Sequence, residues 1–442
     1  MFLLVSAGSV AAQTVTIPAS AVSRLDSVFQ AYAVQGAFSG AVLLSVGDSI
    51  VLEKGYGIRN RVTNSPNEPQ TIYRLGSVTK QFTAFGILRL VDAGKISLQD
   101  PLAKWLPEFP NASDITVHHL LCHTSGLKGY TELAIYDSIK TLQLSPQQLI
   151  AVLRDSPTVF KPGLRFEYSN TGYAILGYLL EQVTGTTYGE YLSQEVFRPL
   201  GMASTGYTWS KPPAHLAQGY KTGLGNTWPP ADSVNLSVPY AAGALCGTVK
   251  DLLAWNRALD SHWGLSEASY KAYYRPNQAN YAYGWVVAPL NGKTVVTHTG
   301  GIDGFSSLNF RILEDSLSFI VLQNVESSPL RLDLVLLNAL YGVPYTLPVV
   351  RTEAAVGPDS FEDYEGTYAL SPTFKLKVYQ SGEKLMVQAT GQPALQIFPE
   401  RTDFFFYKAV DAQLEFLRDD KGRITSLVLH QNGQKVIGTR EN

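Results

Sequence analysis

The segment RLGSVTKQFTAF, residues 74–85, places a small hydroxyl and an amine one helical turn apart. Apolar residues recur at helical spacing from Phe82 to Val91, and Gly94 is a typical helix stop. The pattern predicts an amphipathic helix that begins near Ser77. Ser77 and Lys80 then stand on one face of it, because residues i and i+3 are neighbours on a helix.

This pair has two interpretations. Ser77 can be a helix cap beside a solvated Lys80, or a nucleophile beside its own base. The start of a helix offers free N–H groups and a positive potential, and both stabilise a developing anion. Serine followed three residues later by lysine also occurs at Ser125–Lys128 and at Ser381–Lys384. The first lies in a predicted glycine-rich loop and the second in a predicted hairpin turn, so neither opens a helix.

A nucleophilic serine needs a base, and a charged lysine is not one. A second group must therefore keep Lys80 neutral or relay its proton. The segment FEYSNTGYAIL, residues 166–176, offers a phenol at Tyr168 and an amide at Asn170 just before a predicted helix. The alternative is that Asn170 is only an N-cap and Tyr168 only a packed aromatic residue.

The segment THTGGIDGF, residues 297–305, predicts a strand that ends in a glycine-rich turn. Gly300 and Gly301 would let a substrate backbone lie against this strand and leave an N–H group free for an oxyanion. The alternative is a hairpin that carries a surface histidine, His298. A competing tripeptide, Lys221-Thr222-Gly223, has Gly and Pro neighbours, which predict a loop.

The composition argues against several classes of protein. Of the 442 residues, 35 are Lys or Arg and 37 are Asp or Glu, which leaves a net charge of −2. No basic block stands out, so no nucleic-acid partner is expected. The sequence contains no run of about 18 apolar residues, so no membrane span is predicted.

Metals and cofactors are not expected either. His119 and His123 are four residues apart and could bind a metal on a helix, but HTSG is better explained as a cap and a turn. The chain has no nucleotide-binding glycine motif and no G-x-S-x-G elbow. Cys122 and Cys246 are predicted to be two separate buried thiols rather than a disulfide.

The first residues, MFLLVSAGSVAAQ, look like the end of a secretory signal, with small residues ahead of Gln13. We therefore expect an exported protein, periplasmic or extracellular, and exclude residues 1–12 from the fold.

The rest of the chain divides by its periodicity. Strand patterns at residues 39–58 and 294–325 flank a helical middle, which predicts an α+β unit: a sheet with packed helices and a helical lobe. We assign it residues 13–345. An aperiodic stretch near Tyr341 to Ser360 predicts a linker, placed at 346–359. Short alternating segments then predict an all-β barrel or sandwich at 360–442.

The three motifs together resemble a known family. Ser-x-x-Lys at Ser77, Tyr-x-Asn at Tyr168 and His-Thr-Gly at His298 occur in the order of the serine β-lactamase and DD-peptidase superfamily. The chain is most similar to class C β-lactamases and to the D-alanyl-D-alanine carboxypeptidases, D-aminopeptidases and esterases that share their fold. The stretches ITVHHLLCHTSGL and AAGALCGTVKDLLAW also fit. The C-terminal residues resemble the small lipocalin-like barrels that often follow such domains.

The resemblance implies a function and a role for each motif. Ser77 would be the nucleophile, and Lys80 and Tyr168 would exchange its proton, with either of them as the base. Asn170 would orient Lys80 and a substrate amide. The N–H groups of Ser77 and Gly301 would form the oxyanion hole, and His298 with Thr299 would line the acyl-binding edge.

We therefore expect a serine hydrolase that acts through an acyl-enzyme on small peptides, amides or esters, without a cofactor. One alternative is a peptidase of D-amino-acid cell-wall peptides. Another is a binding or scaffolding protein that kept the fold and lost turnover, although such a protein would not need to retain a base.

The main departure from β-lactamases is a histidine where they carry a lysine in the third motif. An unperturbed imidazole titrates near about 6.5 and carries little charge at neutral pH. We therefore expect slow β-lactam hydrolysis, with acylation by carboxylate-bearing substrates improving as the pH falls toward that value.

Overall fold

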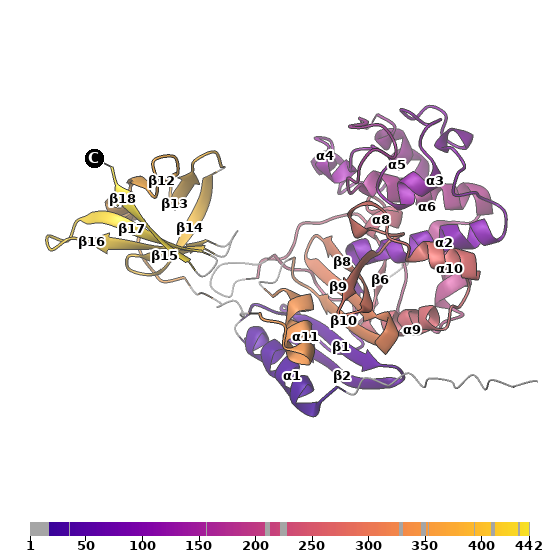
Figure 1. Cartoon of the computed structure of the whole chain (residues 1–442), viewed down its shortest axis with the longest axis horizontal. Coiled ribbons are helices and arrows are strands. Elements are labelled where there is room, and N and C mark those ends of the chain that lie inside the picture. Colours follow the sequence, from indigo (N-terminus) through magenta and orange to yellow (C-terminus); the bar gives the residue numbers. More distant parts are fainter. Residues whose placement is uncertain are drawn as a thin grey trace, which may run out of the picture. The chain divides into compact units, whose positions relative to one another are not determined.

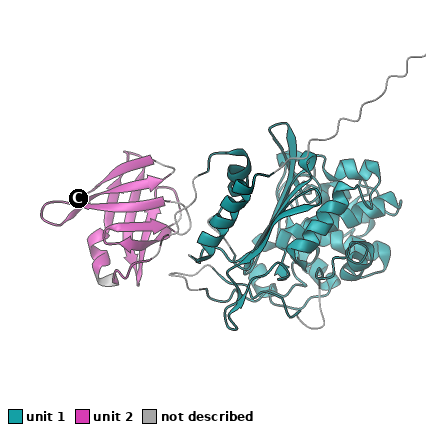
Figure 2. Cartoon of the chain, turned by 90° about the horizontal axis from the view of Figure 1, so that it is seen from below, with its two compact units in different colours: residues 1–222, 228–345 teal, residues 223–227, 346–442 magenta. Residues whose placement is uncertain are grey.

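The computed structural model describes residues 17–34, 36–155, 157–207, 213–221, 228–326, 330–345, 351, 353–392, 394–407, 412–431 and 434–441. The predicted leader, residues 1–12, lies outside them, as do residues 346–350 and 352 of the predicted linker. The described residues fall into two compact units, one up to Tyr345 and one from Arg351 (Figure 2).

The first unit is built on a six-stranded antiparallel sheet of order β2-β1-β10-β9-β8-β7. Its first two strands come from the start of the chain and the other four from residues 286–323, so the helical middle is inserted between them (Figure 1). The strands are β1 Gly40–Val46, β2 Ser49–Tyr56, β7 Val286–Leu290, β8 Lys293–Ile302, β9 Phe305–Ile312 and β10 Leu317–Gln323. Short pairs are formed by β3 Ile58–Asn60 with β4 Ser65–Pro66 and by β5 Tyr73–Arg74 with β6 Cys246–Gly247.

Helices cover both faces of this sheet (Figure 2). The first and last helices of the unit, α1 and α11, pack on each other and α1 also packs on β2, whereas α9 packs against β1 and β10. The helices are α1 Ala19–Val34, α2 Thr79–Asp92, α3 Val117–Leu121, α4 Tyr136–Ile139, α5 Pro146–Leu153, α6 Asn170–Thr184, α7 Tyr188–Leu192, α8 Tyr240–Gly243, α9 Val249–Asp260, α10 Glu267–Tyr273 and α11 Leu332–Tyr341. The predicted α+β organisation, with a helical lobe beside the sheet, is confirmed.

The helix that follows Ser77 differs from its prediction. It is not amphipathic, because α2 is enclosed by α6, α8 and α10 and every residue from Thr79 to Leu90 except Arg89 is buried. Its polar side chains are used inside the protein: Thr83 Oγ1 donates to the carbonyl of Ala241 at 2.7 Å. The polar positions therefore mark internal contacts rather than a solvated face.

The second unit is a closed eight-stranded barrel in which each strand pairs with the next and β18 returns to β11. Its core is separate and aromatic, with Tyr364, Tyr368, Phe405 and Phe416 buried. The strands are β11 Gly366–Ala369, β12 Lys375–Ser381, β13 Lys384–Ala389, β14 Ala394–Arg401, β15 Phe404–Tyr407, β16 Ala412–Arg418, β17 Ile424–Gln431 and β18 Gln434–Arg440. The predicted all-β C-terminal region is confirmed as a barrel.

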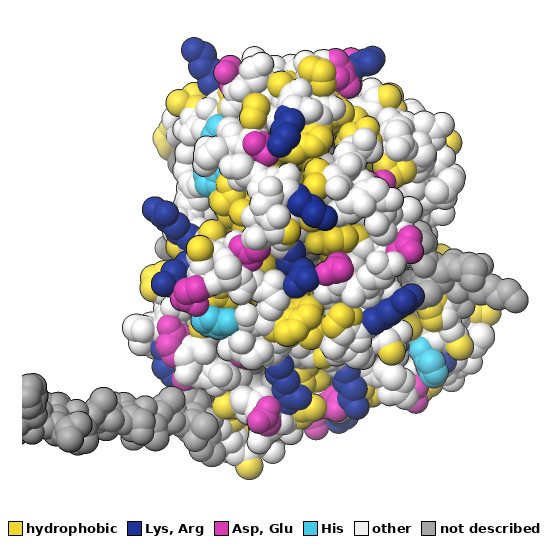
Figure 3. Space-filling view, turned by 90° about the vertical axis from the view of Figure 1, so that its right-hand side faces the viewer, with side chains coloured by type: hydrophobic (Ala, Val, Ile, Leu, Met, Phe, Trp, Pro, Cys, Tyr) yellow, Lys and Arg dark blue, Asp and Glu magenta, His cyan; other side chains and the backbone are white. Residues whose placement is uncertain are grey.

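Two further predictions can be compared with the structure. Cys122 and Cys246 are both buried free thiols, as predicted. None of the described helices has the length and apolar character needed to cross a bilayer. On the face shown in Figure 3, basic and acidic side chains are interspersed, in keeping with the small net charge.

Candidate active site

Ser77 lies in a 3₁₀ turn, Gly76–Val78, that leads directly into α2. The N-cap positions of the turn and of the helix are Leu75 and Val78, and neither receives a side-chain cap. Ser77 is therefore not a helix cap. Its Oγ is 3.1 Å from Nζ of Lys80 and faces a cavity.

Lys80 is completely buried and has no carboxylate partner in the described part of the chain. Its Nζ donates to Asn170 Oδ1 and to the carbonyl of Ala242, both at 2.7 Å, and lies 4.8 Å from the centre of the Tyr168 ring. Burial lowers the pKa of Lys80 well below its usual range, because the ammonium form would lose its hydration without gaining a counter-ion. This lysine is not solvated.

Asn170 is the first residue of α6 and not its cap. Ser169 is the N-cap, and its Oγ accepts a hydrogen bond from the N–H of Gly172. The Asn170 side chain therefore bridges Lys80 and Thr131. Its Oδ1 accepts from Lys80 Nζ, and its Nδ2 donates to Thr131 Oγ1 at 3.3 Å.

The Tyr168 hydroxyl is buried without a hydrogen-bond partner of ordinary geometry among the described residues. Burial raises the pKa of Tyr168, and the nearby Ser77 hydroxyl opposes that shift. The phenol is consequently protonated at neutral pH and retains a proton to donate.

His298 lies on β8 and is buried, with its ring 6.2 Å from that of Tyr168. Nδ1 donates to the carbonyl of Thr299 at 2.6 Å, and Nε2 accepts from the hydroxyl of Tyr281 at 2.9 Å. Burial lowers the pKa of His298 to about 4, because the imidazolium form would lose its hydration. The expected titration near 6.5 is therefore wrong, because it assumed a solvated imidazole.

The two glycines of the third motif differ in their surroundings. A Cβ on Gly300 would come 2.1 Å from the carbonyl oxygen of Leu75 and 2.3 Å from Ser307 Oγ, so this glycine lets the Ser77 turn pack on the strand. A Cβ on Gly301 would meet nothing within 4 Å. The Gly301 nitrogen also lies beside Gly76, since a Cβ there would be 2.8 Å from it.

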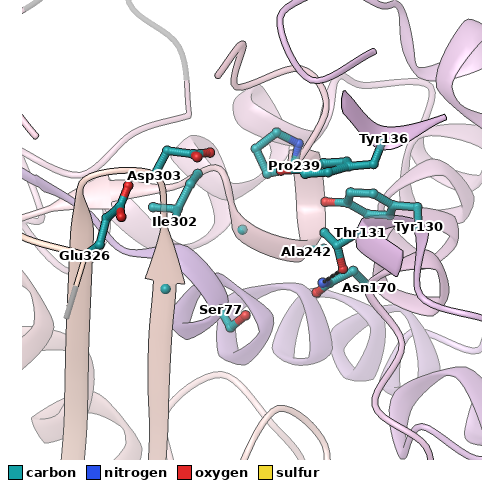
Figure 4. Close-up of a pocket in the computed structure, with 12 residues that line it drawn as sticks. Ser77, Tyr130, Thr131, Tyr136, Asn170, Pro239, Ala242, Ile302, Asp303 and Glu326 are labelled. Carbon is teal, nitrogen blue, oxygen red and sulfur yellow. Dashed lines mark hydrogen bonds between the residues drawn. The ribbon is translucent and has the colours of Figure 1, made fainter. Parts of the chain in front are cut away.

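The cavity above Ser77 has a volume of about 390 Å³ (Figure 4). It is lined by Ser77, Tyr130, Thr131, Tyr136, Asn170, Pro239, Ala242, Gly243, Gly301, Ile302, Asp303 and Glu326. Thr299 is not among these residues. It alternates with His298 along β8 and lines a separate cavity beside α11.

Sequence reasoning missed several residues around this site. His123 has a positive φ of 59°, its Nδ1 accepts from the Ser169 N–H at 3.1 Å, and its ring lies 4.3 Å from that of Tyr168. The HTSG segment thus supports the segment that carries Tyr168. The signal available in the sequence was a histidine directly after the apolar residues Leu120 to Cys122. His119 instead completes a capping box with Thr116.

The competing motifs lie elsewhere. Ser125 Oγ accepts from the Leu127 N–H in a buried loop, and Ser381 pairs with Lys384 at the end of the β12–β13 hairpin. Lys221 forms an exposed ion pair with Asp232, while Thr222 and Gly223 lie outside the described residues.

Comparison with known proteins identifies the family. The family model described as Beta-lactamase matches residues 25–341. The chain belongs to this β-lactamase family. A second model, a domain of unknown function (DUF3471), matches residues 350–440.

Two related proteins and one solved structure agree with this family assignment. The chain is 28% identical to penicillin-binding protein 4* of Bacillus subtilis, over 94% of this chain and 98% of that protein. It is 32% identical to esterase EstB of Burkholderia gladioli, over 51% of this chain and 61% of the esterase. The structure of a D-stereospecific amidohydrolase from Streptomyces sp. superposes with a TM-score of 0.63 at 27% identity, covering 73% of this chain and 99% of that one. The β-lactamase-family chain is therefore a serine hydrolase, and the alternative of a scaffolding protein without turnover is not supported.

Proposed function

We propose that this hydrolase cleaves small amides, peptides or esters through an acyl-enzyme on Ser77, with Lys80 as the base. The observation that carries the proposal is the hydrogen bonding of Lys80. A neutral amine has two N–H donors and one lone pair. Its two shorter contacts, at 2.7 Å, go to oxygens that can only accept, Asn170 Oδ1 and Ala242 O. The lone pair is left for Ser77, whose hydroxyl can donate.

The reaction then follows from the positions of these groups. Ser77 Oγ gives its proton to Lys80 Nζ and bonds to the substrate carbonyl carbon, and the oxyanion is held by the N–H groups of Ser77 and Gly301. The bond to the leaving group breaks as the Tyr168 phenol protonates it, and the proton on Lys80 restores the phenol. A water molecule then gives a proton to neutral Lys80 and bonds to the acyl carbon. The ester bond to Ser77 breaks as Lys80 returns that proton to Ser77 Oγ, and the acid is released. Asn170 holds Lys80 in place, and neutral His298 fixes the pocket wall beside Tyr168.

The substrate class is inferred from the relatives and from the pocket. An esterase and an amidohydrolase are both similar to this chain. No lysine or arginine among the described residues lines the cavity, and His298 is uncharged at neutral pH, so a β-lactam carboxylate lacks a cationic partner. Penicillins should acylate Ser77 and be released slowly.

A second candidate is a carboxypeptidase of D-amino-acid cell-wall peptides. Similarity to penicillin-binding protein 4* along 94% of the chain favours it. It would require the export predicted from residues 1–12.

Covalent labelling tests the proposed nucleophile. We expect a fluorophosphonate to modify the full chain at Ser77 and expect Ser77→Ala to abolish labelling and lower kcat for a p-nitrophenyl ester by at least about 10³-fold. Ser381→Ala, in the exposed hairpin motif, is the matched control and should behave as wild type. A Ser77→Ala variant that keeps a tenth of the activity would show that another nucleophile acts.

A further inference from the structure

The charged residues that line the Ser77 pocket are all acidic in the part of the chain that the structure describes. They are Asp303 and Glu326. Figure 4 shows both carboxylates on one side of the pocket, across from Tyr130 and Thr131, with Ser77 between the two sides. A substrate that enters therefore meets two carboxylates in the same cavity as the reacting serine.

Asp303 belongs to the β8–β9 turn, and Glu326, which follows β10, is hydrogen-bonded to that turn. Asp303 follows Ile302, which pairs with Phe305 to close the β8–β9 hairpin. Gly304, with a φ of 79°, completes the turn, and its N–H donates to Glu326 Oε1 at 3.3 Å. The strand register thus fixes where the two acids face the cavity.

Neither Asp303 nor Glu326 forms an ion pair with any residue that the structure describes. Three cations lie close enough to interact electrostatically with these carboxylates. Arg74 and Lys140 act on Asp303, and Lys221 acts on both. Arg74 lies over the ring of Phe305, 5.6 Å from its centre. The two lysines have other partners: Lys140 pairs with Asp137 at 2.9 Å and Lys221 pairs with Asp232 at 2.7 Å. The two pocket carboxylates are thus available to a ligand.

The position of the turn indicates which end of a substrate it would meet. Tyr168, the proposed donor to the leaving group, lies beside His298, three residues before Gly301 on β8. Asp303 lies two residues after Gly301, about 7 Å further along the chain. The leaving group therefore points toward His298 and the acyl part of the substrate toward Asp303. In this arrangement His298 lies on the leaving-group side and not on the acyl side expected from the sequence.

We propose that Asp303 and Glu326 form a subsite for a substrate ammonium group, so that the enzyme prefers amides, esters or peptides whose acyl part carries a free amine. This inference rests on the proposed function of Ser77. The two carboxylates attract the ammonium as the acyl carbonyl docks at Gly301, and they repel acyl groups that carry a carboxylate.

Matched substrates test the preference with the full chain. We would measure kcat/KM for phenylalanine p-nitroanilide with a free amine, with an N-acetyl group and with an N-succinyl group, each as the D and the L enantiomer. A charge-assisted hydrogen bond predicts that, for the better enantiomer, the free amine exceeds the N-acetyl compound by about tenfold. The N-succinyl compound should be the poorest.

Variants and pH assign the preference to these residues. Asp303→Asn and Glu326→Gln should each lower the free-amine to N-acetyl ratio of kcat/KM, because the ammonium group loses a charged partner that the N-acetyl group never had. Glu108→Gln, an exposed carboxylate that does not line the pocket, is the control. The ratio should also fall as the pH rises through the pKa of the substrate amine, because the neutral amine is not attracted.

The outcomes separate the two proposals. Equal rates for the free amine and the N-acetyl compound, both dependent on Ser77, would overturn the ammonium subsite and leave the hydrolase intact. If the anilides turn over too slowly, protection of Ser77 from fluorophosphonate is measured instead, with the corresponding amides as competitors. Stronger protection by the free amine supports the subsite, and equal or absent protection contradicts it. Failure of fluorophosphonate to label Ser77 at all contradicts the proposed function itself.

Discussion

Lys80 shows how one buried amine can serve catalysis at the expense of stability. In the unfolded chain a lysine is charged up to a pH of about 10.4, whereas burial favours the neutral amine in the folded protein. Folding at a pH between the folded and the unfolded pKa therefore releases a proton from this side chain. Because the unfolded state binds more protons, stability rises with pH between the folded and the unfolded pKa.

The variant Lys80→Met should remove this pH dependence together with activity. We expect the free energy of unfolding of the variant, relative to wild type, to fall as the pH rises from 7 to 10, by up to about 1.4 kcal/mol per pH unit. Denaturant unfolding at several pH values measures it. Lys384→Met, in the exposed hairpin motif, should follow wild type throughout. Parallel stability curves for wild type and Lys80→Met would show that Lys80 is charged in the folded protein.

The depressed pKa of His298 leads to a different pH prediction. Since its imidazole is neutral above about pH 5, the ratio of kcat/KM for a chromogenic cephalosporin to that for a neutral p-nitrophenyl ester should stay flat from pH 5.5 to 8. The effect of Lys80 ionisation on kcat/KM is common to both substrates and therefore cancels in the ratio. The contrary result would be a ratio that rises as the pH falls, with a midpoint near about 6.5, and that no longer does so in His298→Gln. It would show a solvated histidine at the substrate carboxylate.

At the level of elements, the catalytic cluster depends on the contact between the Ser77 turn and strand β8. Ser307 Oγ donates to the carbonyl of Leu75 at 2.7 Å, and Gly300 leaves the space for that contact. This contact places the Gly301 N–H next to the turn.

A pair of alanine substitutions tests the difference between the two glycines. Gly300→Ala forces a Cβ against backbone and should lower the free energy of unfolding by more than about 2 kcal/mol and slow the labelling of Ser77. Gly301→Ala meets nothing within 4 Å and should change stability by less than about 0.5 kcal/mol, with its effect confined to kcat/KM. Thermal unfolding and labelling kinetics distinguish the two. Equal destabilisation would mean that the turn does not pack on β8 as described.

The sequence predicted the elements of the fold because their periodicity is local. Its spaced motifs also named Ser77, Lys80 and Asn170, whose side chains the structure brings into contact. It could not predict what depends on tertiary packing. Gln81 and Thr83 look solvated in a helical pattern but are buried in contact with other elements. Asp303 and Glu326 are 23 positions apart and line one cavity only through the register of β8, β9 and β10. The pKa of His298 likewise depends on burial, which no motif encodes.

At the level of the whole molecule, the main hydrophobic cores of the two units, as far as the structure describes them, have no residue in common. The core of the first unit surrounds α2 and includes Phe82, Phe85 and Trp255, and that of the barrel includes Tyr364 and Phe405. Because burial of apolar area is the main stabilising contribution, each unit has the means to fold by itself.

Truncation after Val350 tests this independence. We expect a soluble protein whose Ser77 is labelled by fluorophosphonate at a rate within about threefold of the full chain, since the residues of the described site all precede Tyr345. Its thermal unfolding should reproduce one transition of the full chain, and a fragment from Arg351 onward should reproduce the other. If the truncated protein is insoluble where the full chain is soluble, or if the full chain unfolds in one step that neither fragment shows, then the two units depend on each other for stability despite their separate cores.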